Sequence, residues 1–295
     1  MKLRALAPAK VNLSLFLGAT REDGRHRLVT VFESLSLADT LELEVLEDGQ
    51  RDQVLCAGVE GENLAALALA ALRARGWGGP PVRLTIEKRI PIAAGMAGGS
   101  ADAAAALRLA MAIAPGRAEE VDLVAATLGA DVPSQLLPGV AVGSGAGEIV
   151  ERFEPLAQHA FVVLPSEFAL STPDVFREAD RLARPRSDAQ LAHAYRDVTG
   201  GLTPGRRLPD ELIVNELEPA AISLCPACAD ALAAVRLAGA DHAIVSGSGP
   251  TVVGIWWGSD ASQRAGLAAD GLRDIYPGAV VATPVAAEFG APLLI

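Results

Sequence analysis

Apolar and polar side chains alternate in several short stretches of the chain. Residues 11–17 carry apolar side chains at every odd position, and residues 82–88 repeat this pattern at every even position from Val82 to Ile86. A period of two is typical of strands that bury one face. Further strands are expected over 39–46, at the start of 139–147, and over 160–164, 243–245 and 251–257.

Helices are predicted where apolar residues recur with a longer period between capping and breaking residues. One is expected over 63–75, with Asn63 as its N-cap and Gly76 just past its end. An alanine-rich helix is expected over 102–111 with Ser100 as its cap. Another helix is expected over 119–128, with Gly129 just past its end. Residues 171–174 indicate the start of a further helix, and two more are expected over 216–224 and 226–237.

Strands and helices mixed in this order predict an α+β protein with two lobes that meet at a cleft. A change of composition near Glu154 and Pro155 divides the chain into an N-terminal lobe, 1–154, and a C-terminal lobe, 155–295. The most polar and irregular stretch, 184–210, is expected to hold a short helix inside an exposed excursion.

Composition narrows the class of protein. The chain has 295 residues, of which 51% are hydrophobic, and a formal net charge of −11. The acidic balance argues against nucleic acid as a partner, because binding the phosphate backbone needs a basic face. Three cysteines, no long apolar run and no leader-like N-terminus predict a cytoplasmic protein without a membrane partner.

A small-residue loop joins the strand at 82–88 to the alanine-rich helix. It consists of Pro91, Ile92, Ala93, Ala94, Gly95, Met96, Ala97, Gly98, Gly99, Ser100 and Ala101. Backbone N–H groups of such a loop can close on an anion, and the helix presents its positive end to the same point. No lysine follows Gly99, so the loop is not a Walker A motif. The alternative is a glycine-alanine turn without a ligand.

Four separated segments resemble the GHMP kinases: 8–13, the loop at 91–101, 128–133 and 246–251. Residues 23–26 and 215–220 strengthen the resemblance, which runs from Ala7 to Gly254. It implies a ribosomal-S5-like N-terminal lobe and a ferredoxin-like C-terminal lobe. It also implies ATP with Mg²⁺ as phosphoryl donor and a cytidylated methylerythritol as acceptor. Alternatives are a GHMP kinase for another small alcohol, of homoserine or mevalonate type, and a non-catalytic nucleotide sensor of the same fold.

The resemblance assigns catalysis to Lys10 and Asp131. Phosphoryl transfer needs positioning, charge neutralisation and a group that takes the hydroxyl proton. Asp131 is the expected base, and Pro133 behind it predicts a helix start whose positive end favours the carboxylate. Lys10 is expected to stabilise the developing alkoxide. For either residue alone the alternative is a surface ion pair.

Other site residues also follow from the resemblance. Residues 91–101, Asn63 and Lys88 are assigned to ATP, and Ser100 is also the candidate ligand for the metal. The acceptor is assigned to Asn12, Arg25, His26, Asp131 and Thr172. Asn63 also suits a helix cap, Thr172 suits another, and Lys88 suits a solvated strand end. Asp102 is either a water-mediated metal ligand or a charge that matches the helix dipole.

Three positions depart from the pattern of the family. Ala97 stands where glycine is usual, which predicts either a negative φ there or a shifted loop. Met96 replaces leucine, a change that nearly conserves volume. Arg25 stands where an aromatic residue usually precedes the histidine, and we expect its planar guanidinium to cover the cytosine instead. The alternative is that residues 23–25 form a polar hairpin turn with Arg25 in solvent.

Two further motifs have weaker meanings. Cys225 and Cys228 have the spacing of a redox motif or half a zinc site, but no second pair exists, which favours a structural role. The glycine-rich run 143–147 lacks dinucleotide-binding spacing and is expected to form a hairpin or a wall of the cleft. The sequence leaves the oligomeric state open.

Overall fold

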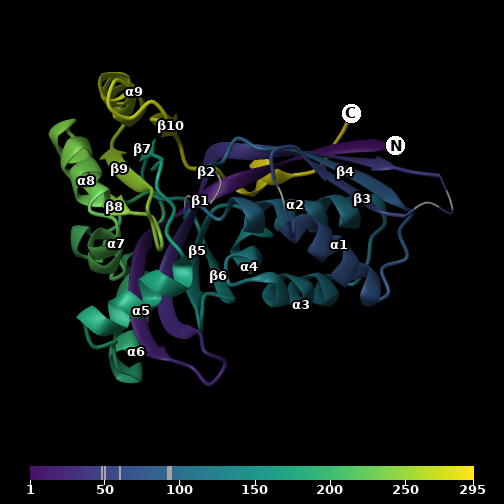
Figure 1. Cartoon of the computed structure of the whole chain (residues 1–295), viewed down its shortest axis with the longest axis horizontal. Helices are drawn as coiled ribbons and strands as arrows, with labels where there is room; N and C mark the ends of the chain where they lie inside the picture. The colour runs from purple at the N-terminus through teal and green to yellow at the C-terminus, as the bar shows by residue number, and fades with distance from the viewer. Residues whose placement is uncertain (48, 50, 60, 92–94) are drawn as a thin grey trace.

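The computed structural model describes residues 1–295 except 48, 50, 60 and 92–94. Its strands form two sheets (Figure 1). The first sheet runs in the order β11-β1-β2-β4-β3, with β5 on β2 and β6 on β5. Its strands are β1 (Lys2–Thr20), β2 (His26–Val45), β3 (Gln53–Cys56), β4 (Val82–Glu87), β5 (Val140–Ser144), β6 (Ile149–Phe153) and β11 (Leu293–Leu294).

The second sheet runs in the order β10-β7-β9-β8 and is wholly antiparallel. Its strands are β7 (His159–Leu164), β8 (His242–Val245), β9 (Val252–Trp257) and β10 (Val280–Ala282). The second sheet lies at one end of the molecule in Figure 1, and the first sheet extends from there to the other end, where both chain termini lie. The mixed architecture confirms the predicted α+β class with two lobes.

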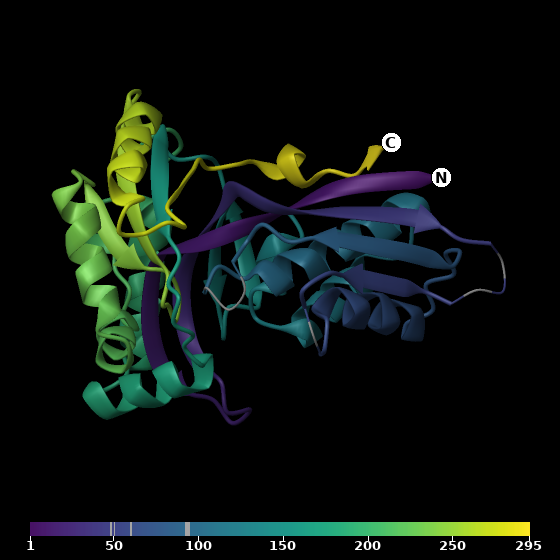
Figure 2. The ribbon, with the colours of Figure 1, turned by 45° about the horizontal axis from the view of Figure 1, so that its top comes forward.

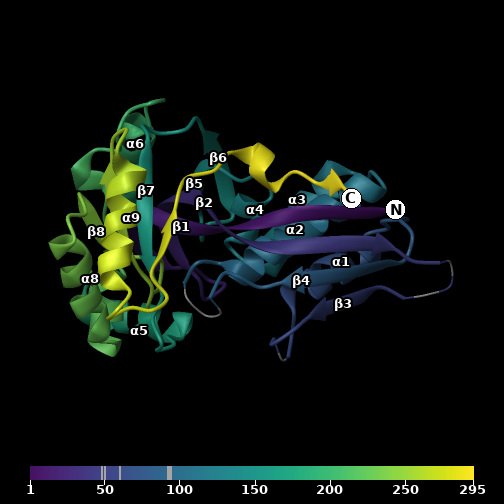
Figure 3. The ribbon, with the colours of Figure 1, turned by 90° about the horizontal axis from the view of Figure 1, so that it is seen from above.

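The helices in the described part of the first half of the chain are α1 (Leu64–Ala74), α2 (Gly98–Ile113), α3 (Ala118–Leu128) and α4 (Val132–Gln135). Five belong to the second half: α5 (Thr172–Leu182), α6 (Asp188–Gly201), α7 (Glu218–Leu224), α8 (Ala227–Leu237) and α9 (Ala261–Leu272). Short 3-10 turns lie at η1 (Asp210–Leu212) and η2 (Ala287–Gly290). Figure 3 shows α8 and α9 outside the second sheet, whereas α1, α2 and α3 lie together against the first.

The hairpin of β1 and β2 is much longer than the sequence predicted. The expected strands were 11–17 and 39–46, whereas β1 has 19 residues and β2 has 20. The pairing register shifts between Pro8 and Lys10 and again between Asn12 and Ser14. Each bulge changes which residues face the core, so a period-two pattern is lost across it. Figure 2 shows this hairpin running from the termini into the opposite end of the molecule.

The region 184–210 is more ordered than predicted. Instead of a short helix in an exposed excursion, α6 has 14 residues and includes Gly200 and Gly201. Ser187 and Gln190 form a capping box at its start, and three apolar side chains on one face are buried: Leu191, Ala194 and Val198. Tertiary burial of this face compensates for the low helix propensity of the terminal glycines.

One hydrophobic core joins the two sheets. It contains the alanines of α2, side chains of β1 and β2, and Phe161, Val163, Val253 and Ile255 of the second sheet. Residues 101 and 103–106 of α2 are all buried alanines, whose small side chains let this helix be covered on every side. The chain passes from the first sheet to the second between Phe153 and His159, and its last strand, β11, pairs with β1 in the first sheet. Division of the chain at 154 and 155 stays a prediction.

A buried ion pair connects the two sheets. His159 Nε2 of β7 lies 2.8 Å from Glu33 Oε2 of β2, and both side chains are 1% exposed. Burial alone would lower the pKa of His159, but the Glu33 carboxylate and the Ala157 carbonyl outweigh burial and raise that pKa. Protonation of the His159 imidazole is therefore more favourable in the folded protein than in the unfolded chain.

This pair predicts a pH-dependent stability. Since the pKa of His159 is raised on folding, its stabilising effect is complete below the unfolded value of about 6.5 and is lost as pH rises through the folded value. We expect the difference in melting temperature between wild type and His159→Gln to be larger at about pH 6 than at about pH 9, by about 2 °C or more. The exposed His193→Gln is the control. An equal difference at both pH values would contradict the prediction.

Candidate active site

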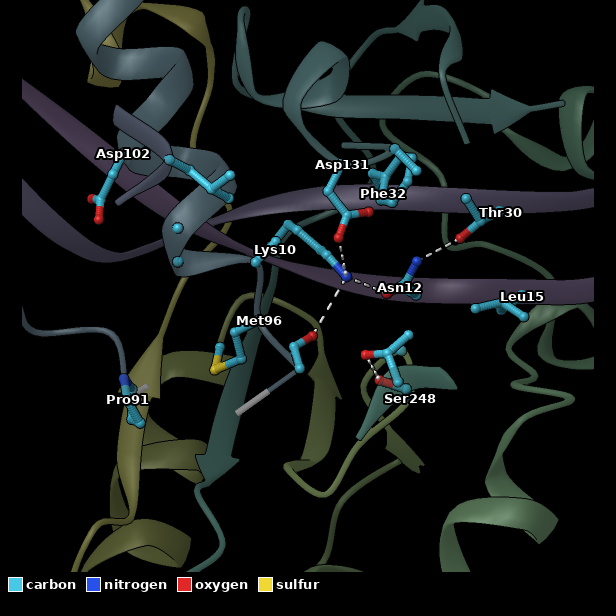
Figure 4. A pocket seen from close by; sticks show the side chains of 18 of the residues that line it. Lys10, Asn12, Leu15, Thr30, Phe32, Pro91, Met96, Asp102, Asp131 and Ser248 are labelled. Carbon is cyan, nitrogen blue, oxygen red and sulfur yellow. Dashed lines mark hydrogen bonds and ion pairs between the residues drawn. The ribbon is translucent and has the colours of Figure 1, made fainter. Parts of the chain in front are cut away.

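A cavity of about 470 Å³ opens where the two halves of the chain meet. Figure 4 shows the side chains around it. Its lining comes from β1 and β2, the segment between β3 and α1, the segment from the end of β4 to the start of α2, and the loop before α4. The β5–β6 turn, α5, Leu217 and the turn between β8 and β9 complete the lining. The predicted site residues that line it are Lys10, Asn12, Asn63, Lys88, Pro91, Gly95, Met96, Ala97, Gly98, Gly99, Asp102, Asp131 and Thr172.

The structure brings together the two residues expected to carry catalysis. Lys10 Nζ on β1 lies 3.6 Å from Asp131 Oδ2 at the start of α4, and the two point toward each other across the cavity (Figure 4). The Lys10 side chain is 5% exposed and that of Asp131 is 34% exposed. The carboxylate is therefore accessible to a ligand, whereas the ammonium reaches it from inside the protein.

The helix that begins after Asp131 is very short. Asp131 is the N-cap residue of α4, and Pro133 lies in the first turn, as predicted. However, α4 has only four residues, and the Asp131 side chain makes no capping hydrogen bond. A helix dipole grows with the number of aligned peptide units, so the expected effect of the helix end on this carboxylate is small. Lys10 is therefore the main positive charge beside Asp131.

Among the described residues, three acceptors contact the Lys10 ammonium. Its Nζ donates to Asn12 Oδ1 at 2.7 Å and to the Gly95 carbonyl at 3.4 Å, in addition to the ion pair with Asp131. The ring of Phe32 lies beneath it, with 5.7 Å between Nζ and the ring centroid. An ammonium has three protons to donate, so the acceptors match its capacity.

The loop before α2 differs from the prediction at its cap. The helix begins at Gly98, its N-cap is Ala97, and Ser100 lies inside the first turn, so Ser100 is not the cap. Ala97 has φ +56°, which excludes the first of its two predicted alternatives, a negative φ, and leaves the second, a shifted loop. The left-handed conformation is costly for alanine and is held by the surrounding structure. Ile92, Ala93 and Ala94 lie outside the described residues.

The glycines at the start of α2 leave little space for side chains. A Cβ atom on Gly98 would lie 3.3 Å from Lys88 Nζ, and one on Gly99 would lie 3.3 Å from a methyl carbon of Leu64. Neither glycine has a positive φ. The two glycines are therefore needed because they let neighbouring groups come close to the N-terminus of α2. At the end of this 16-residue helix, free backbone N–H groups favour the binding of anions. Ser100 and Ala101 lie one step further into the helix and do not line the cavity.

Lys88 is not a solvated strand end. Its ammonium donates to Asp39 Oδ2 at 2.5 Å and to Asp102 Oδ2 at 2.6 Å, and its side chain is 14% exposed. Burial alone would lower the pKa of Lys88, but the two carboxylates raise it. Burial raises the pKa of Asp102 to about 7, although Lys88 opposes this shift. Asp102 is thus a partner of Lys88 rather than a charge that serves only the helix dipole.

Asn63 and Met96 have the structural roles that their residue types suggest. Asn63 is the N-cap of α1, and its Oδ1 accepts hydrogen bonds from the N–H groups of Ala65 and Ala66. It also lines the cavity, so capping and ligand contact are compatible. Met96 is 1% exposed and packs in the main core.

The β1–β2 hairpin places His26 near the cavity and keeps Arg25 in the turn. Arg25 donates from its backbone N–H and its Nε to the Asp23 carboxylate, at 3.0 Å and 3.1 Å, and does not line the cavity. His26 Nε2 lies 2.9 Å from Asp180 Oδ1 of α5. The His26 ring packs on Phe176, with 4.9 Å between ring centroids, and Phe176 lines the cavity.

Phe176 is a site residue that the sequence motifs did not reveal. It lies four residues after Thr172 on α5, and residues four apart share one face of a helix. Once Thr172 was assigned to the site, its helical spacing to Phe176 indicated that Phe176 faces the same site. Thr172 itself is the first residue of α5 rather than its cap, which is Ser171, and its Oγ1 lies 3.0 Å from Ser248 Oγ.

The segment 215–220 fixes the turn between β8 and β9. Asn215 Nδ2 donates to the carbonyls of Val245 and Gly247, at 2.8 Å and 2.7 Å, and the Glu218 carboxylate accepts the N–H of Val245. Gly247 and the adjacent Ser248 line the cavity. The polar side chains of this motif thus position one wall of the site without entering it.

The two weaker motifs are structural. Cys225 and Cys228 are buried free thiols in the core of the second sheet, and burial together with the neighbouring thiol raises the pKa of Cys228 to about 12. Residues 143–147 belong to the β5–β6 hairpin, and Ala146 lines the cavity, as predicted. Among the described residues, no cluster of three metal-ligating side chains occurs, and no helix is long and apolar enough to cross a membrane.

Comparisons with known proteins identify the class. A model of the GHMP kinases N terminal domain matches residues 63–139, and one of the GHMP kinases C terminal matches residues 205–270. A homoserine kinase from Cytophaga hutchinsonii superimposes with a TM-score of 0.72 at 19% identity, covering 100% of this chain and 97% of that one, which shows the shared fold. The chain belongs to the GHMP kinase family and is a small-molecule kinase.

More similar relatives carry one name. The 4-diphosphocytidyl-2-C-methyl-D-erythritol kinase of Streptomyces coelicolor is 41% identical, with 100% of both chains covered. That of Corynebacterium efficiens is also 41% identical, covering 93% of this chain and 90% of its own. A crystal structure of 4-(cytidine 5′-diphospho)-2C-methyl-D-erythritol kinase has a TM-score of 0.75 at 34% identity, covering 95% of this chain and 98% of that one.

Proposed function

We propose that the chain transfers the γ-phosphoryl group of ATP to the 2-hydroxyl of 4-diphosphocytidyl-2-C-methyl-D-erythritol, a step in isoprenoid precursor biosynthesis by the methylerythritol phosphate pathway. The contact that carries this proposal is the 3.6 Å pair of Lys10 and Asp131 in the cavity beside the N-terminus of α2. The full-length relatives support the choice of acceptor. A cytoplasmic location stays a prediction from the sequence.

In the proposed reaction the protein positions charge around the transferring group. The first N–H groups of α2 bind the triphosphate, because they present free donors and the positive helix end at one end of the cavity. Lys88 lines the same end, where it is paired with Asp39 and Asp102. Asp131 accepts the proton of the acceptor hydroxyl, and Lys10 stabilises the alkoxide that develops. Lys10 is held from inside the protein, so it needs little reorganisation during the reaction.

Mg²⁺ fits the residues at this end of the cavity. Asp102 lines the cavity, and its Oδ1 has no hydrogen-bond partner in the described part of the chain. Mg²⁺ prefers oxygen ligands and is usually held by one or two carboxylates together with substrate phosphates. Asp102 would hold the ion, which would neutralise charge on the phosphates. Ser100, the ligand that the resemblance implies, does not line the cavity.

The cytosine is proposed to bind beside the β1–β2 hairpin. Phe176 offers an aromatic face to the cavity, and His26 is packed against it. Base stacking on an aromatic or guanidinium plane is worth about 1 to 3 kcal/mol. We propose that Arg25 leaves Asp23 and covers the second face of the base, while His26 contacts its edge. Asn12 and Thr172 are proposed contacts to the rest of the acceptor.

Substitutions in this region test the acceptor. We expect Phe176→Ala and Arg25→Ala each to raise the KM for the cytidylated substrate by about tenfold with little change in kcat, because stacking contributes equally to ground and transition states. Steady-state kinetics with both substrates varied gives these values. Arg27→Ala is the matched control, since Arg27 lies two residues after Arg25, on β2, but pairs with the exposed Asp188.

The outcomes separate the two stacking residues. An unaltered KM in Arg25→Ala would remove Arg25 from the substrate site, whereas the same result in Phe176→Ala would argue against the base site itself. An assay of wild type with cytidylated and free alcohols, including homoserine and mevalonate, tests the acceptor directly. Turnover of a free alcohol alone would overturn the proposed function.

A further inference from the structure

We propose that Thr30 is a positioning residue, whose hydroxyl orients the Asn12 amide and thereby places the Lys10 ammonium. Thr30 lies on β2, where it pairs with Leu15 of β1, and its side chain reaches that of Asn12 and is buried at the wall of the cavity (Figure 4). It touches neither Lys10 nor Asp131 through any hydrogen bond among the described residues. The inference deepens the proposed function, because it concerns the same site.

The hydrogen bonds around Thr30 have one possible direction. Its Oγ1 lies 2.6 Å from the Ser14 carbonyl, and a carbonyl only accepts, so the hydroxyl proton belongs to that bond. The lone pairs of Oγ1 remain for Asn12, whose Nδ2 lies 2.7 Å away and donates. The amide oxygen of Asn12 must then face the opposite way.

The opposite side of the Asn12 amide is where Lys10 needs an acceptor. Lys10 Nζ donates to Asn12 Oδ1 at 2.7 Å, the shortest of its three polar contacts. A flipped amide would present an NH₂ group to the ammonium, which has only protons to offer. Thr30 therefore sets the one orientation of Asn12 that binds Lys10. The hydrogen bonds run from the Ser14 carbonyl of β1 through Thr30 and Asn12 to Lys10.

Loss of the Thr30 hydroxyl would leave the Asn12 amide without the acceptor that fixes its orientation. Asn12 is 3% exposed, so its NH₂ group cannot turn to bulk water when Thr30 no longer accepts it. An unpaired buried amide is costly, which favours other orientations of Asn12. Lys10 would then keep only its longer contacts to Gly95 and Asp131. The ATP end of the cavity would be unaffected, because the hydrogen bonds of Thr30 go only to Asn12 and Ser14 among the described residues.

The test compares two substitutions at one position. Thr30→Val keeps the shape and removes the hydroxyl, and we expect it to lower kcat by about tenfold with the KM for ATP unchanged. Thr30→Ser keeps the hydroxyl and should restore kcat to within about twofold of wild type. Thr199→Val on α6 is the matched control, because in the described part of the chain its hydroxyl donates only to helix carbonyls, and it does not line the cavity.

A double-mutant cycle separates positioning from a structural role. If Thr30 acts through Asn12, Thr30→Val should have no further effect on kcat in an Asn12→Ala background, since directly coupled residues are not additive. Additive losses would overturn the proposal, as would a kcat for Thr30→Val within about twofold of wild type. An equal loss in Thr30→Ser would overturn it too, because the effect would then belong to packing.

Two further measurements keep the proposal falsifiable. If Thr30→Val does not fold, Thr30→Ala takes its place with the same expected results. Wild-type turnover of the cytidylated acceptor tests the proposed function by itself. If the wild type accepts another alcohol instead, the Thr30 comparison is made with that alcohol, so that the two proposals fail separately.

Discussion

Replacement of Lys10 by methionine, or of Asp131 by asparagine, is expected to lower kcat by about 100-fold or more while the affinity for ATP stays nearly unchanged. Both side chains act on the acceptor hydroxyl, whose charge develops only in the transition state. Lys10 is held by Asn12 and Gly95, and only 3.6 Å separates its Nζ from Asp131 Oδ2. Pre-steady-state turnover and equilibrium titration with an ATP analogue measure the two quantities.

Because the two residues form one unit, the double variant should lose no more than about the larger single effect. Lys2→Met is the control, since Lys2 forms an exposed ion pair with Glu42 at the far end of β1. Nearly normal turnover in either single variant would remove that residue from the chemistry. Loss of ATP affinity equal to the loss of kcat would indicate damage to the whole cavity.

The second large effect is expected at Gly95. It has φ +70°, and a Cβ atom there would lie 2.7 Å from the Gly249 carbonyl oxygen and 2.8 Å from that of Ser246. Both neighbours are backbone atoms of the turn fixed by Asn215, so they cannot move aside cheaply. Gly95→Ala should therefore displace the loop and the carbonyl that binds Lys10. We expect kcat/KM for ATP to fall by about 100-fold.

Gly76→Ala separates backbone strain from the clash. Gly76 has φ +89° after α1, and a Cβ atom there would meet no described neighbour within 4 Å. Both substitutions carry the cost of a left-handed alanine, about 1 to 2 kcal/mol, but only Gly95→Ala meets backbone. We expect Gly76→Ala to lose stability and keep activity. Steady-state kinetics measures the activity of both variants, and thermal melts measure their stability. An equal loss of kcat/KM in the two variants would contradict the role assigned to the contact between Gly95 and the turn.

Local sequence signals predicted most elements that depend on short-range rules. Asn63 and Gly76 bound α1 because a side-chain cap and a positive φ act within a few residues. The strands β4, β7 and β9 also fall where the apolar runs indicated, since their faces keep one environment throughout. The same locality explains why Thr172 pointed toward Phe176, one helical turn further along α5.

Elements shaped by distant contacts were predicted poorly. The bulges in β1 interrupt its period-two pattern, so the sequence did not indicate the full length of the hairpin. The helix α6 is stabilised because one of its faces is buried against residues that lie elsewhere in the chain. Ala97 takes a left-handed conformation and caps α2, although an isolated alanine disfavours it. In each case tertiary packing supplies free energy that exceeds a local preference of about 1 kcal/mol.

The sequence by itself determined the fold class, the family resemblance and the chemical types of the site residues, because motifs carry residue identity and spacing. Only the tertiary structure decided how those residues act together. It brought Lys10 within 3.6 Å of Asp131, paired Lys88 with Asp39 and Asp102, and joined Thr30 to Asn12. Hydrogen bonds and ion pairs depend on distance and direction between side chains, and only the folded chain brings such distant residues into contact.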